Sequence, residues 1–508
     1  MDLFSSLILG FKVALTPINL LFATAGVIIG QIVGILPGLG PMVTIAVLLP
    51  FTYGLDPIPA IMAFAGIYYG SQFGGAISSI LVNAPGTESA VITALEGYPM
   101  AKKGKAGLAL ATAAVSSFTG GTIGVIFLIL LSPLMIKLVL TFGAPEYFAL
   151  MLFALACITG LSEGSTFPKT MFSIFMGLGL AMIGMDPVSS SARMTFGIGE
   201  LFEGIDFIVL AIGMFAFAEV LKNLSKVDYT KPKEKVAVNS KVGISYKEWL
   251  YILPTTIRAA FIGFFIGVLP GVGTTTSSPL AYVTEKNLAR NKGNFNNGEA
   301  KGVAAGESSN NAGAMGAMVP LLTMGIPGSG TTAIMLTAFM ILGIMPGPLL
   351  FTEQPNLVWG LVASFFIGNF ILLALNLPLV RFLVKILQVP NEILFTLVLL
   401  LASIGAYSLG MRTFDIWLVI IFGLMGHFLK RYNFPLAPVL VSLILGRMVE
   451  NNFARSMAMS GKDLSIFFAR PVSTFLIVAA VLFLVVPQII AFIRKRRTAQ
   501  DDKVALTK

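Results

Sequence analysis

The sequence GILPGLG, at residues 34–40, interrupts an apolar segment and returns as GVLPGVG at residues 267–273. A second pair follows in the same order, with NAPGTE at residues 83–88 and GIPGSG at residues 325–330. Chance recurrence does not account well for two matched pairs in one order. The pattern predicts an internal duplication like those of secondary transporters.

Each of these four stretches breaks a helix within an apolar segment. Proline lacks the backbone N–H that a helix needs, and glycine costs about 1 kcal/mol relative to alanine. In hydrocarbon, irregular backbone is tolerated only where it is buried in protein or lines a wet cavity. One break alone would indicate an ordinary kink. Four breaks in two pairs predict discontinuous helices or re-entrant hairpins around a binding site.

The composition is that of a membrane protein. Of 508 residues, 56% are hydrophobic and 11% are charged, and the mean hydropathy is +0.88. Soluble domains carry roughly 25% charged residues, so a water-soluble globule is excluded. With about 20 apolar residues per crossing, we expect an all-α polytopic membrane protein with about 12–14 membrane segments.

Two rare residue types limit the chemistry. Cys157 is the single cysteine, which excludes an intrachain disulfide and a cysteine metal cluster, and it is expected to serve packing. His427 is the single histidine, which argues against histidine triads and multi-histidine zinc sites. Because FLKR follows it at residues 428–431, we interpret His427 as an interfacial residue rather than a proton relay. We expect neither an enzyme nor a bound cofactor.

Basic residues mark the loops. The 34 basic and 24 acidic residues give a net charge of +10, but Lys and Arg gather between apolar segments, as in cytosolic loops, so no nucleic-acid partner is expected. The long polar stretch at residues 222–248 contains seven lysines. We predict a first membrane repeat at residues 1–221, a basic cytosolic linker at 222–248, a second membrane repeat at 249–497 and a polar C-terminal tail at 498–508.

Charges in corresponding loops favour inverted repeats. KKGK at residues 102–105 follows the second break of the first repeat, whereas residues 345–355 of the second repeat contain no Lys or Arg. Conversely, residues 51–59 contain no Lys or Arg, whereas residues 285–301 carry four. By the positive-inside rule, corresponding loops then lie on opposite membrane faces. This arrangement predicts two inverted-topology repeats.

Polar groups around the breaks form a candidate site for a small anion. Hydroxyls and free N–H groups at helix starts can hold a carboxylate without a buried lysine, which would be costly to desolvate. The candidate substrate-binding residues are Pro37, Gly38, Gly40, Asn83, Pro85, Gly86, Thr87, Thr274, Thr275, Thr276, Pro327, Gly328 and Ser329.

A coupling cation would need oxygen ligands near the same breaks. Asn310 and Asn311 offer side-chain carbonyls that suit a small hard cation, with helix capping as an equally weighted alternative. Gly271 and Gly325 lie where broken helices expose backbone carbonyls. These four residues are the candidate cation-site residues.

Two other features have simpler interpretations. Gly26, Gly30, Gly34 and Gly38 recur every four residues and are expected to let two helices pack closely. Arg258 lies about two turns from the basic linker, where it could meet an anion or extend its side chain to the membrane surface.

The residues alone leave more than one transport function open. GSG at residues 328–330 is not a phosphate loop, because no Gly-Lys-Ser/Thr follows it. Pro-Gly breaks also line selectivity filters, so a passive anion channel is one alternative. A stand-alone carboxylate transporter without a binding protein is another.

Several motifs in combination resemble the large membrane subunit (TctA-type) of the tripartite tricarboxylate transporters. They are GILPGLGP at residues 34–41, YYG at 68–70, NAPG at 83–86, EGYPMA at 96–101, NNA at 310–312 and GIPGS at 325–329. One departure is Glu96, where the family's segment has Asp. The change conserves the charge.

This resemblance implies a multi-pass transporter of the bacterial inner membrane that takes up small di- or tricarboxylates by symport. It further implies two protein partners, a small membrane subunit (TctB-type) and a periplasmic substrate-binding protein (TctC-type). The expected coupling ion is Na⁺ or H⁺. Similarity to the large subunit of other binding-protein-dependent secondary transporters implies an elevator-like motion.

Overall fold

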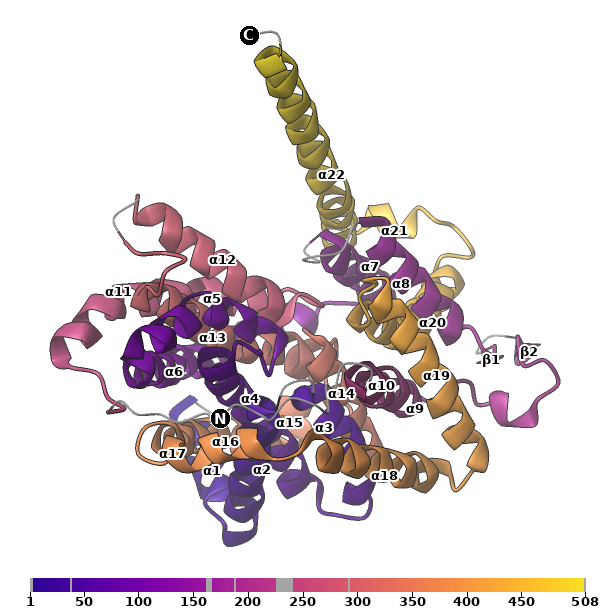
Figure 1. Cartoon of the computed structure of the whole chain (residues 1–508). Helices are drawn as coiled ribbons and strands as arrows, with labels where there is room; N and C mark the ends of the chain where they lie inside the picture. The colour runs from indigo at the N-terminus through magenta and orange to yellow at the C-terminus, as the bar shows by residue number, and fades with distance from the viewer. Residues whose placement is uncertain are drawn as a thin grey trace.

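The computed structural model describes residues 3–36, 39–160, 167–186, 189–224, 241–290 and 293–506, and these are mainly helical (Figure 1). The α-helices are α1 (Leu3–Ala14), α2 (Pro17–Ile35), α3 (Gly40–Leu48), α4 (Pro57–Val82), α5 (Val91–Met100), α6 (Ala106–Val139), α7 (Ala144–Gly160), α8 (Phe167–Ala181), α9 (Phe207–Ala211), α10 (Ala218–Leu224), α11 (Tyr246–Gly267), α12 (Gly273–Leu288), α13 (Ala300–Met324), α14 (Gly330–Ile341), α15 (Leu350–Glu353), α16 (Pro355–Asn376), α17 (Val380–Leu383), α18 (Asn391–Gly410), α19 (Thr413–Arg431), α20 (Ala437–Met459), α21 (Ile466–Ala469) and α22 (Pro471–Leu506). In the described residues, strand pairing is limited to β1 (Gly184–Met185) and β2 (Ala192–Arg193), which are antiparallel. The predicted all-α class is confirmed.

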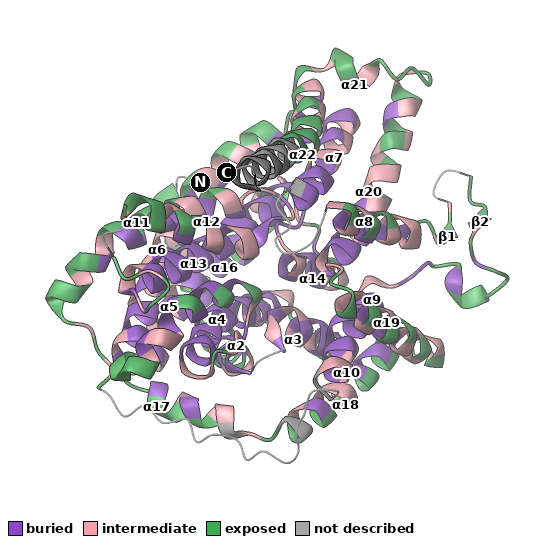
Figure 2. Ribbon diagram, turned by 45° about the horizontal axis from the view of Figure 1, so that its top comes forward, coloured by how far each residue is buried: buried purple, intermediate pink, exposed green. Residues whose placement is uncertain are grey.

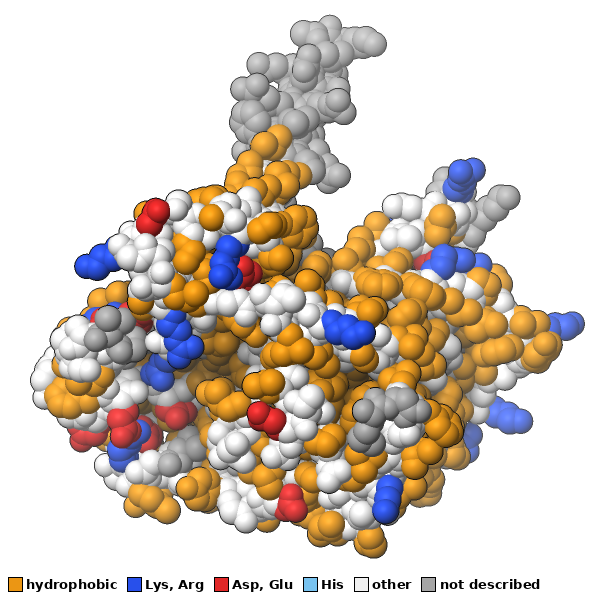
Figure 3. Space-filling model, turned by 180° about the vertical axis from the view of Figure 1, so that it is seen from behind, with side chains coloured by type: hydrophobic (Ala, Val, Ile, Leu, Met, Phe, Trp, Pro, Cys, Tyr) orange, Lys and Arg blue, Asp and Glu red, His pale blue; other side chains and the backbone are white. Residues whose placement is uncertain are grey.

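Many of these helices are suited to a bilayer. Within the described residues, five spans are long and apolar enough to cross a membrane, and they are Pro17–Ile35, Glu88–Val139, Tyr246–Gly267, Pro355–Asn376 and Thr413–Arg431. Shorter apolar helices, such as Ala144–Thr159 and Gly330–Ile341, accompany them. Hydrophobic side chains cover large parts of the face seen in Figure 3. The chain is therefore a multi-pass membrane protein, and the number of its crossings stays a prediction.

Local sequence signals set the ends of the helices next to the breaks. Asp56 caps the start of α4 by accepting a hydrogen bond from the Ile58 N–H at 3.0 Å. α4 ends at Asn83 and α13 ends at Gly325, both in the left-handed conformation, with φ of 53° and 69°. Asparagine and glycine are the residues that adopt this conformation most readily. Both helices therefore stop and turn at the start of matched sequence motifs, at residues 83–88 and 325–330.

Glycines bring two matched helix pairs into backbone contact. A Cβ atom at Gly30 of α2 would lie 2.3 Å from the carbonyl oxygen of Ile67 in α4. In the second repeat, a Cβ atom at Gly263 of α11 would lie 2.3 Å from the carbonyl oxygen of Ser309 in α13. Only glycine fits at such distances. The predicted close packing through Gly26, Gly30 and Gly34 is confirmed, and Gly38 lies outside the described residues.

The two helices that receive these contacts form the centre of the molecule. Nearly all residues of α4 and α13 are buried, and both are coloured mainly purple in Figure 2. Around α13 pack α5, α6, α11 and α12, so helices from both predicted repeats enclose it. Helices of the first half also pack on helices of the second half elsewhere, with α1 on α16, α7 on α22 and α8 on α20. The two halves of the sequence are thus interlocked.

The structure bears on two of the predicted domain boundaries, those of the linker and of the C-terminal tail. Of the linker at 222–248, the stretch 225–240 lies outside the described residues. α22 continues as a helix through the predicted boundary at residue 497 to Leu506. The assignment of residues 1–221 and 249–497 to two repeats stays a prediction.

We predict that Gly30→Ala destabilises the protein although alanine is the better helix former. Its Cβ would overpack the contact with Ile67, a cost of about 1–3 kcal/mol. Gly179→Ala is the matched control, because a Cβ atom at Gly179 in α8 meets open space. Thermal unfolding in detergent should show a lower Tm for Gly30→Ala and an equal or higher Tm for Gly179→Ala. Equal Tm values for both variants would contradict the packing argument.

Candidate functional site

Within each repeat, the two breaks touch each other. In the second repeat, the Gly271 N–H donates a hydrogen bond to the Pro327 carbonyl at 3.3 Å. In the first repeat, a Cβ atom at Gly86 would lie 1.7 Å from the carbonyl oxygen of Gly34, so the backbones are in contact there. The structure therefore brings together the paired breaks that the repeated motifs predicted.

The breaks of one repeat also meet those of the other. A Cβ atom at Gly330, where α14 begins, would lie 2.3 Å from the Met42 methyl group of α3. The hydroxyl of Tyr68 in α4 lies beside Ser329. Ser329 starts α14 with a capping box, in which its Oγ accepts from the Thr332 N–H at 3.2 Å. The break at residues 325–330 therefore lies against α3 and α4 of the first half of the sequence.

A cavity of about 1350 Å³ opens where the breaks converge. Eight of the predicted site residues line it, and these are Gly40, Pro85, Gly86, Thr87, Gly271, Thr274, Thr275 and Ser329. Tyr68 and Gln72 of α4 add further polar groups to the wall. The wall thus combines hydroxyls with the starts of α3, α12 and α14. This chemistry suits a small anion.

Four other predicted substrate-binding residues that the structure describes are not among those that line the cavity. Asn83 ends α4, and Gly328 packs against the backbone of Ala317. The Pro327 carbonyl accepts the bond from Gly271, and Thr276 lies in the first turn of α12. Pro37 and Gly38 lie outside the described residues.

The two predicted asparagine ligands lie in the middle of α13. They are fully buried and far from either end of the helix, so the capping alternative is wrong. Among the described residues, Asn310 Nδ2 and Asn310 Oδ1 have no hydrogen-bond partner. Asn311 Oδ1 likewise accepts no hydrogen bond there. Buried amides are normally satisfied, so unpartnered oxygens at this depth are suited to a cation.

The packing of α5 against α13 shows at what level of the molecule Asn310 lies. Ile92 lies against Gly306, and Glu96 lies against Gly302, so the two helices run antiparallel. α13 also contacts the 3-10 turn at Glu88–Ala90, which directly precedes α5. Asn310 therefore lies near the level of Glu88, in the break at residues 83–88, here called the first tip. The asparagine pair is therefore level with the cavity.

The four predicted cation ligands do not form one group. Asn311 and Gly325 are 14 positions apart along one continuous helix, a distance of about 21 Å along the axis at 1.5 Å per residue. Gly271 contacts the loop that follows Gly325 through Pro327. The expectation of a single site made by all four residues is therefore wrong, because α13 runs unbroken between them.

Glu307 is a buried carboxylate that the sequence analysis missed. It is fully buried in α13, where it accepts hydrogen bonds from the hydroxyls of Thr93 and of Ser117, the latter at 2.9 Å. None of the ion pairs in the described part of the chain includes Glu307. The Asn311 amide donates to its backbone carbonyl at 3.0 Å. An acidic residue amid small residues of a buried helix was the signal that could have identified it.

Charged residues complete the cavity wall. They are Glu88, the last residue of the break at 83–88, together with Glu219 and Lys222 of α10 and His427, Lys430 and Arg431 of α19. His427 thus lines the cavity, and its Nδ1 is buried without a partner in the described structure. The sequence pattern HFLKR at residues 427–431 resembled the end of an ordinary membrane helix. The packing of α19 against the π-helix Ile212–Phe217 brings it to the cavity.

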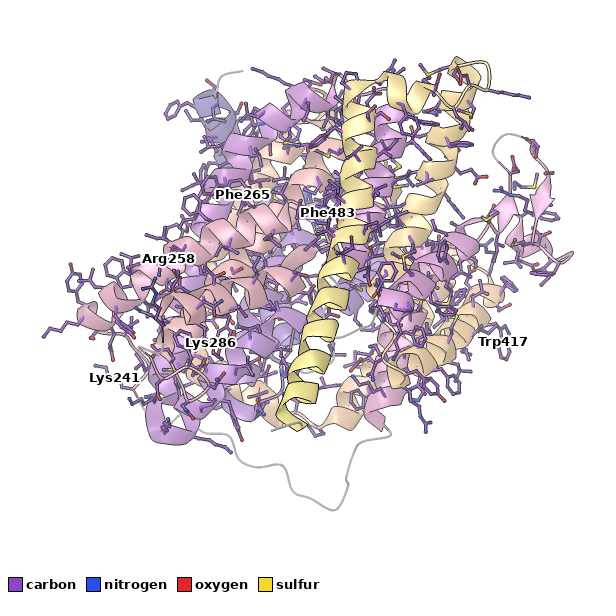
Figure 4. All side chains as sticks on the ribbon, turned by 90° about the horizontal axis from the view of Figure 1, so that it is seen from above. Lys241, Arg258, Phe265, Lys286, Trp417 and Phe483 are labelled. Atoms are coloured by element: carbon purple, nitrogen blue, oxygen red, sulfur yellow. The ribbon has the colours of Figure 1, made fainter. Side chains whose placement is uncertain are left out.

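Two other charged residues have structural partners. Arg258 of α11 pairs with Glu285 of α12 at 2.7 Å, so neither alternative expected for it describes its contact. Figure 4 shows Arg258 and Lys286 on these neighbouring helices. Glu96, the departure from the family motif, is fully buried and accepts hydrogen bonds from the backbone N–H groups of Asn296, Gly298 and Glu299. It thereby fixes the start of α13.

The comparisons with known proteins agree with this architecture. Residues 20–441 match the Tripartite tricarboxylate transporter TctA family. A relative from Agrobacterium vitis, described as an uncharacterized 52.8 kDa protein in the TAR-I ttuC' 3' region, is 41% identical over 504 residues and covers 99% of both chains. A second one, an uncharacterized protein in the TAR-II ttuC' 3' region of the same organism, is 41% identical over 215 residues, which are 42% of this chain and 89% of that relative. No solved structure matches the chain. With most of its length matched, the chain belongs to the tripartite tricarboxylate transporter TctA family.

Proposed function

We propose that this chain is the large transport subunit of a binding-protein-dependent secondary transporter that takes up small di- or tricarboxylates. The observation that carries the proposal is the convergence of the breaks of both repeats on one cavity lined by hydroxyls and helix starts. A carboxylate there would accept hydrogen bonds from Thr274, Thr275 and Ser329. Neutral donors of this kind hold an anion and still release it, because no buried charge is left unpaired when the substrate leaves.

The same proposal assigns a coupling cation, Na⁺ or H⁺, to the middle of α13. Where the ion is Na⁺, Asn310 and Asn311 would hold it with their unpartnered side-chain oxygens. Ser309, whose buried hydroxyl also has no hydrogen-bond partner in the described structure, lies next to them. Because the asparagine pair is level with the first tip, cation and substrate would each favour the tip conformation that binds the other. Binding that is coupled in this way makes uptake depend on the ion gradient.

Two inverted repeats and an elevator-like motion complete the proposal. The loops predicted to be cytosolic lie against each other, since Lys103 donates to the Asn297 carbonyl at 2.6 Å and Glu96 binds the N–H groups of residues 296, 298 and 299. They come from different positions in the two repeats, as inversion requires. We place the chain in the bacterial inner membrane, where the TctB-type subunit and the periplasmic TctC-type protein would be its partners.

We predict that Thr275→Val and Ser329→Ala weaken uptake. A hydrogen bond to a charged group contributes about 1.5–3 kcal/mol, so the apparent affinity should fall roughly tenfold or more. Thr284→Val is the matched control, because Thr284 lies on α12 with its hydroxyl bound to the Leu280 carbonyl at 2.7 Å, away from the cavity. Uptake by the reconstituted complex measures the effect. Unchanged kinetics in both cavity variants would refute the proposed site.

We predict that Lys103→Cys and Lys286→Cys are labelled from the cytosol, and Tyr53→Cys and Met345→Cys from the periplasm. The native Cys157 is buried and should stay unlabelled. A membrane-impermeant maleimide on intact cells and on inverted vesicles distinguishes the two sides. Labelling of either lysine position in intact cells would contradict the inverted arrangement.

We predict that the purified chain alone transports little carboxylate in proteoliposomes with an inward Na⁺ or H⁺ gradient. Addition of the small membrane subunit and the loaded periplasmic protein should give most of the activity, because the receptor must favour one transporter state to drive the cycle. Accumulation against the gradient excludes a passive anion channel. Full uptake by the chain alone would instead support a stand-alone transporter.

A further inference from the structure

One wall of the cavity carries charge that the breaks do not supply. This wall is the last turn of α19, with Lys430 and Arg431, together with Glu219 and Lys222 of α10. Trp417, near the start of α19, lies at the edge of the molecule in Figure 4. Across the cavity, Glu88 at the first tip is close enough for its charge to interact with those of Lys430 and Glu219.

The positive charges on this wall exceed the negative ones. Lys430 forms an ion pair with Glu219, and Lys222 approaches the same carboxylate at 3.7 Å. Arg431 is exposed to the cavity and takes part in no ion pair within the described part of the chain. Three cations on the cavity wall therefore face two carboxylates, and Arg431 is the one that pairs with no acidic side chain among the described residues.

We propose that Arg431, supported by Lys430, forms a second anion subsite that receives a further carboxylate of the substrate. The inference rests on the proposed function, in which the hydroxyls and helix starts at the breaks hold one carboxylate. A second carboxylate enclosed in the same cavity needs its own partner, because an unpaired charge is costly to desolvate. The planar guanidinium of Arg431 can bind a carboxylate through two parallel hydrogen bonds.

This division of labour gives the cavity a basis for selecting its substrate. A monocarboxylate would bind the hydroxyls and helix starts at the breaks and make no contact with Arg431. A di- or tricarboxylate would bind those donors with one carboxylate and Arg431 with another. A carboxylate placed beside Glu88 would meet another carboxyl group, whereas one placed toward α19 would meet Lys430 and Arg431. The subsite therefore distinguishes polycarboxylates from monocarboxylates.

The test is direct binding of succinate, tartrate, citrate and propionate to the purified full-length chain. Arg431→Gln should weaken binding of the tightest di- or tricarboxylate at least tenfold, leave propionate unchanged, and be partly rescued by Arg431→Lys. Arg455→Gln is the matched control, because Arg455 is exposed on α20 and is not among the residues that line the cavity. Arg431 is preferred to Lys430 for substitution, because the loss of Lys430 would remove a partner of Glu219.

The outcomes separate this subsite from the proposed function. Equal binding of the polycarboxylate by native chain and Arg431→Gln would refute the subsite, while a loss in Thr275→Val would still support the site at the breaks. An equal loss for propionate and for the polycarboxylates would also refute it, since a general attraction of anions would then suffice. If the native chain binds none of the four acids, both the proposed substrate class and the subsite are wrong.

Discussion

Backbone contact through glycine between α2 and α4, and again between α11 and α13, sets the distances in the centre of the molecule. At Gly30 and Gly263, a Cβ atom would lie 2.3 Å from a carbonyl oxygen of the facing helix. Without a hydrophobic driving force between helices in lipid, such close van der Waals packing is a main source of stability. It sets the positions of α4 and α13 relative to their neighbours. The breaks that follow these helices consequently begin beside the cavity.

Buried carboxylates join the two halves of the chain through polar contacts. Glu96 of the first half binds backbone N–H groups at the start of α13, and Glu307 of the second half accepts hydrogen bonds from Thr93 and Ser117. Each carboxylate lacks the water that would otherwise solvate it, so loss of these donors would leave a charge unsatisfied. The helix α5 carries both Thr93 and Glu96 and thereby fixes the height of the first tip against α13.

The cavity wall has a neutral polar part and a charged part, which under our proposal would recognise an anion in two different ways. Around the breaks, neutral hydroxyls and helix starts surround the space, and on the α19 side the charges of Lys430 and Arg431 face it. Neutral donors bind an anion with little penalty when it leaves, whereas charged groups bind more tightly and give specificity. A transporter needs both properties, since its site must recognise a carboxylate on one side of the membrane and release it on the other.

The sequence determined the membrane class, the family resemblance, the matched breaks and the glycine contacts, because each depends on local composition or on helical spacing along one segment. It also identified the hydroxyls of Thr274, Thr275 and Ser329 that line the cavity. It could not show that Asn310 and Asn311 lie mid-helix, far from Gly325, or that Glu307 lies beside them. The tertiary structure alone decided that the end of α19 closes the cavity opposite residues more than 100 positions away. Such proximity arises from how distant helices pack, and no local pattern at residues 427–431 encodes it.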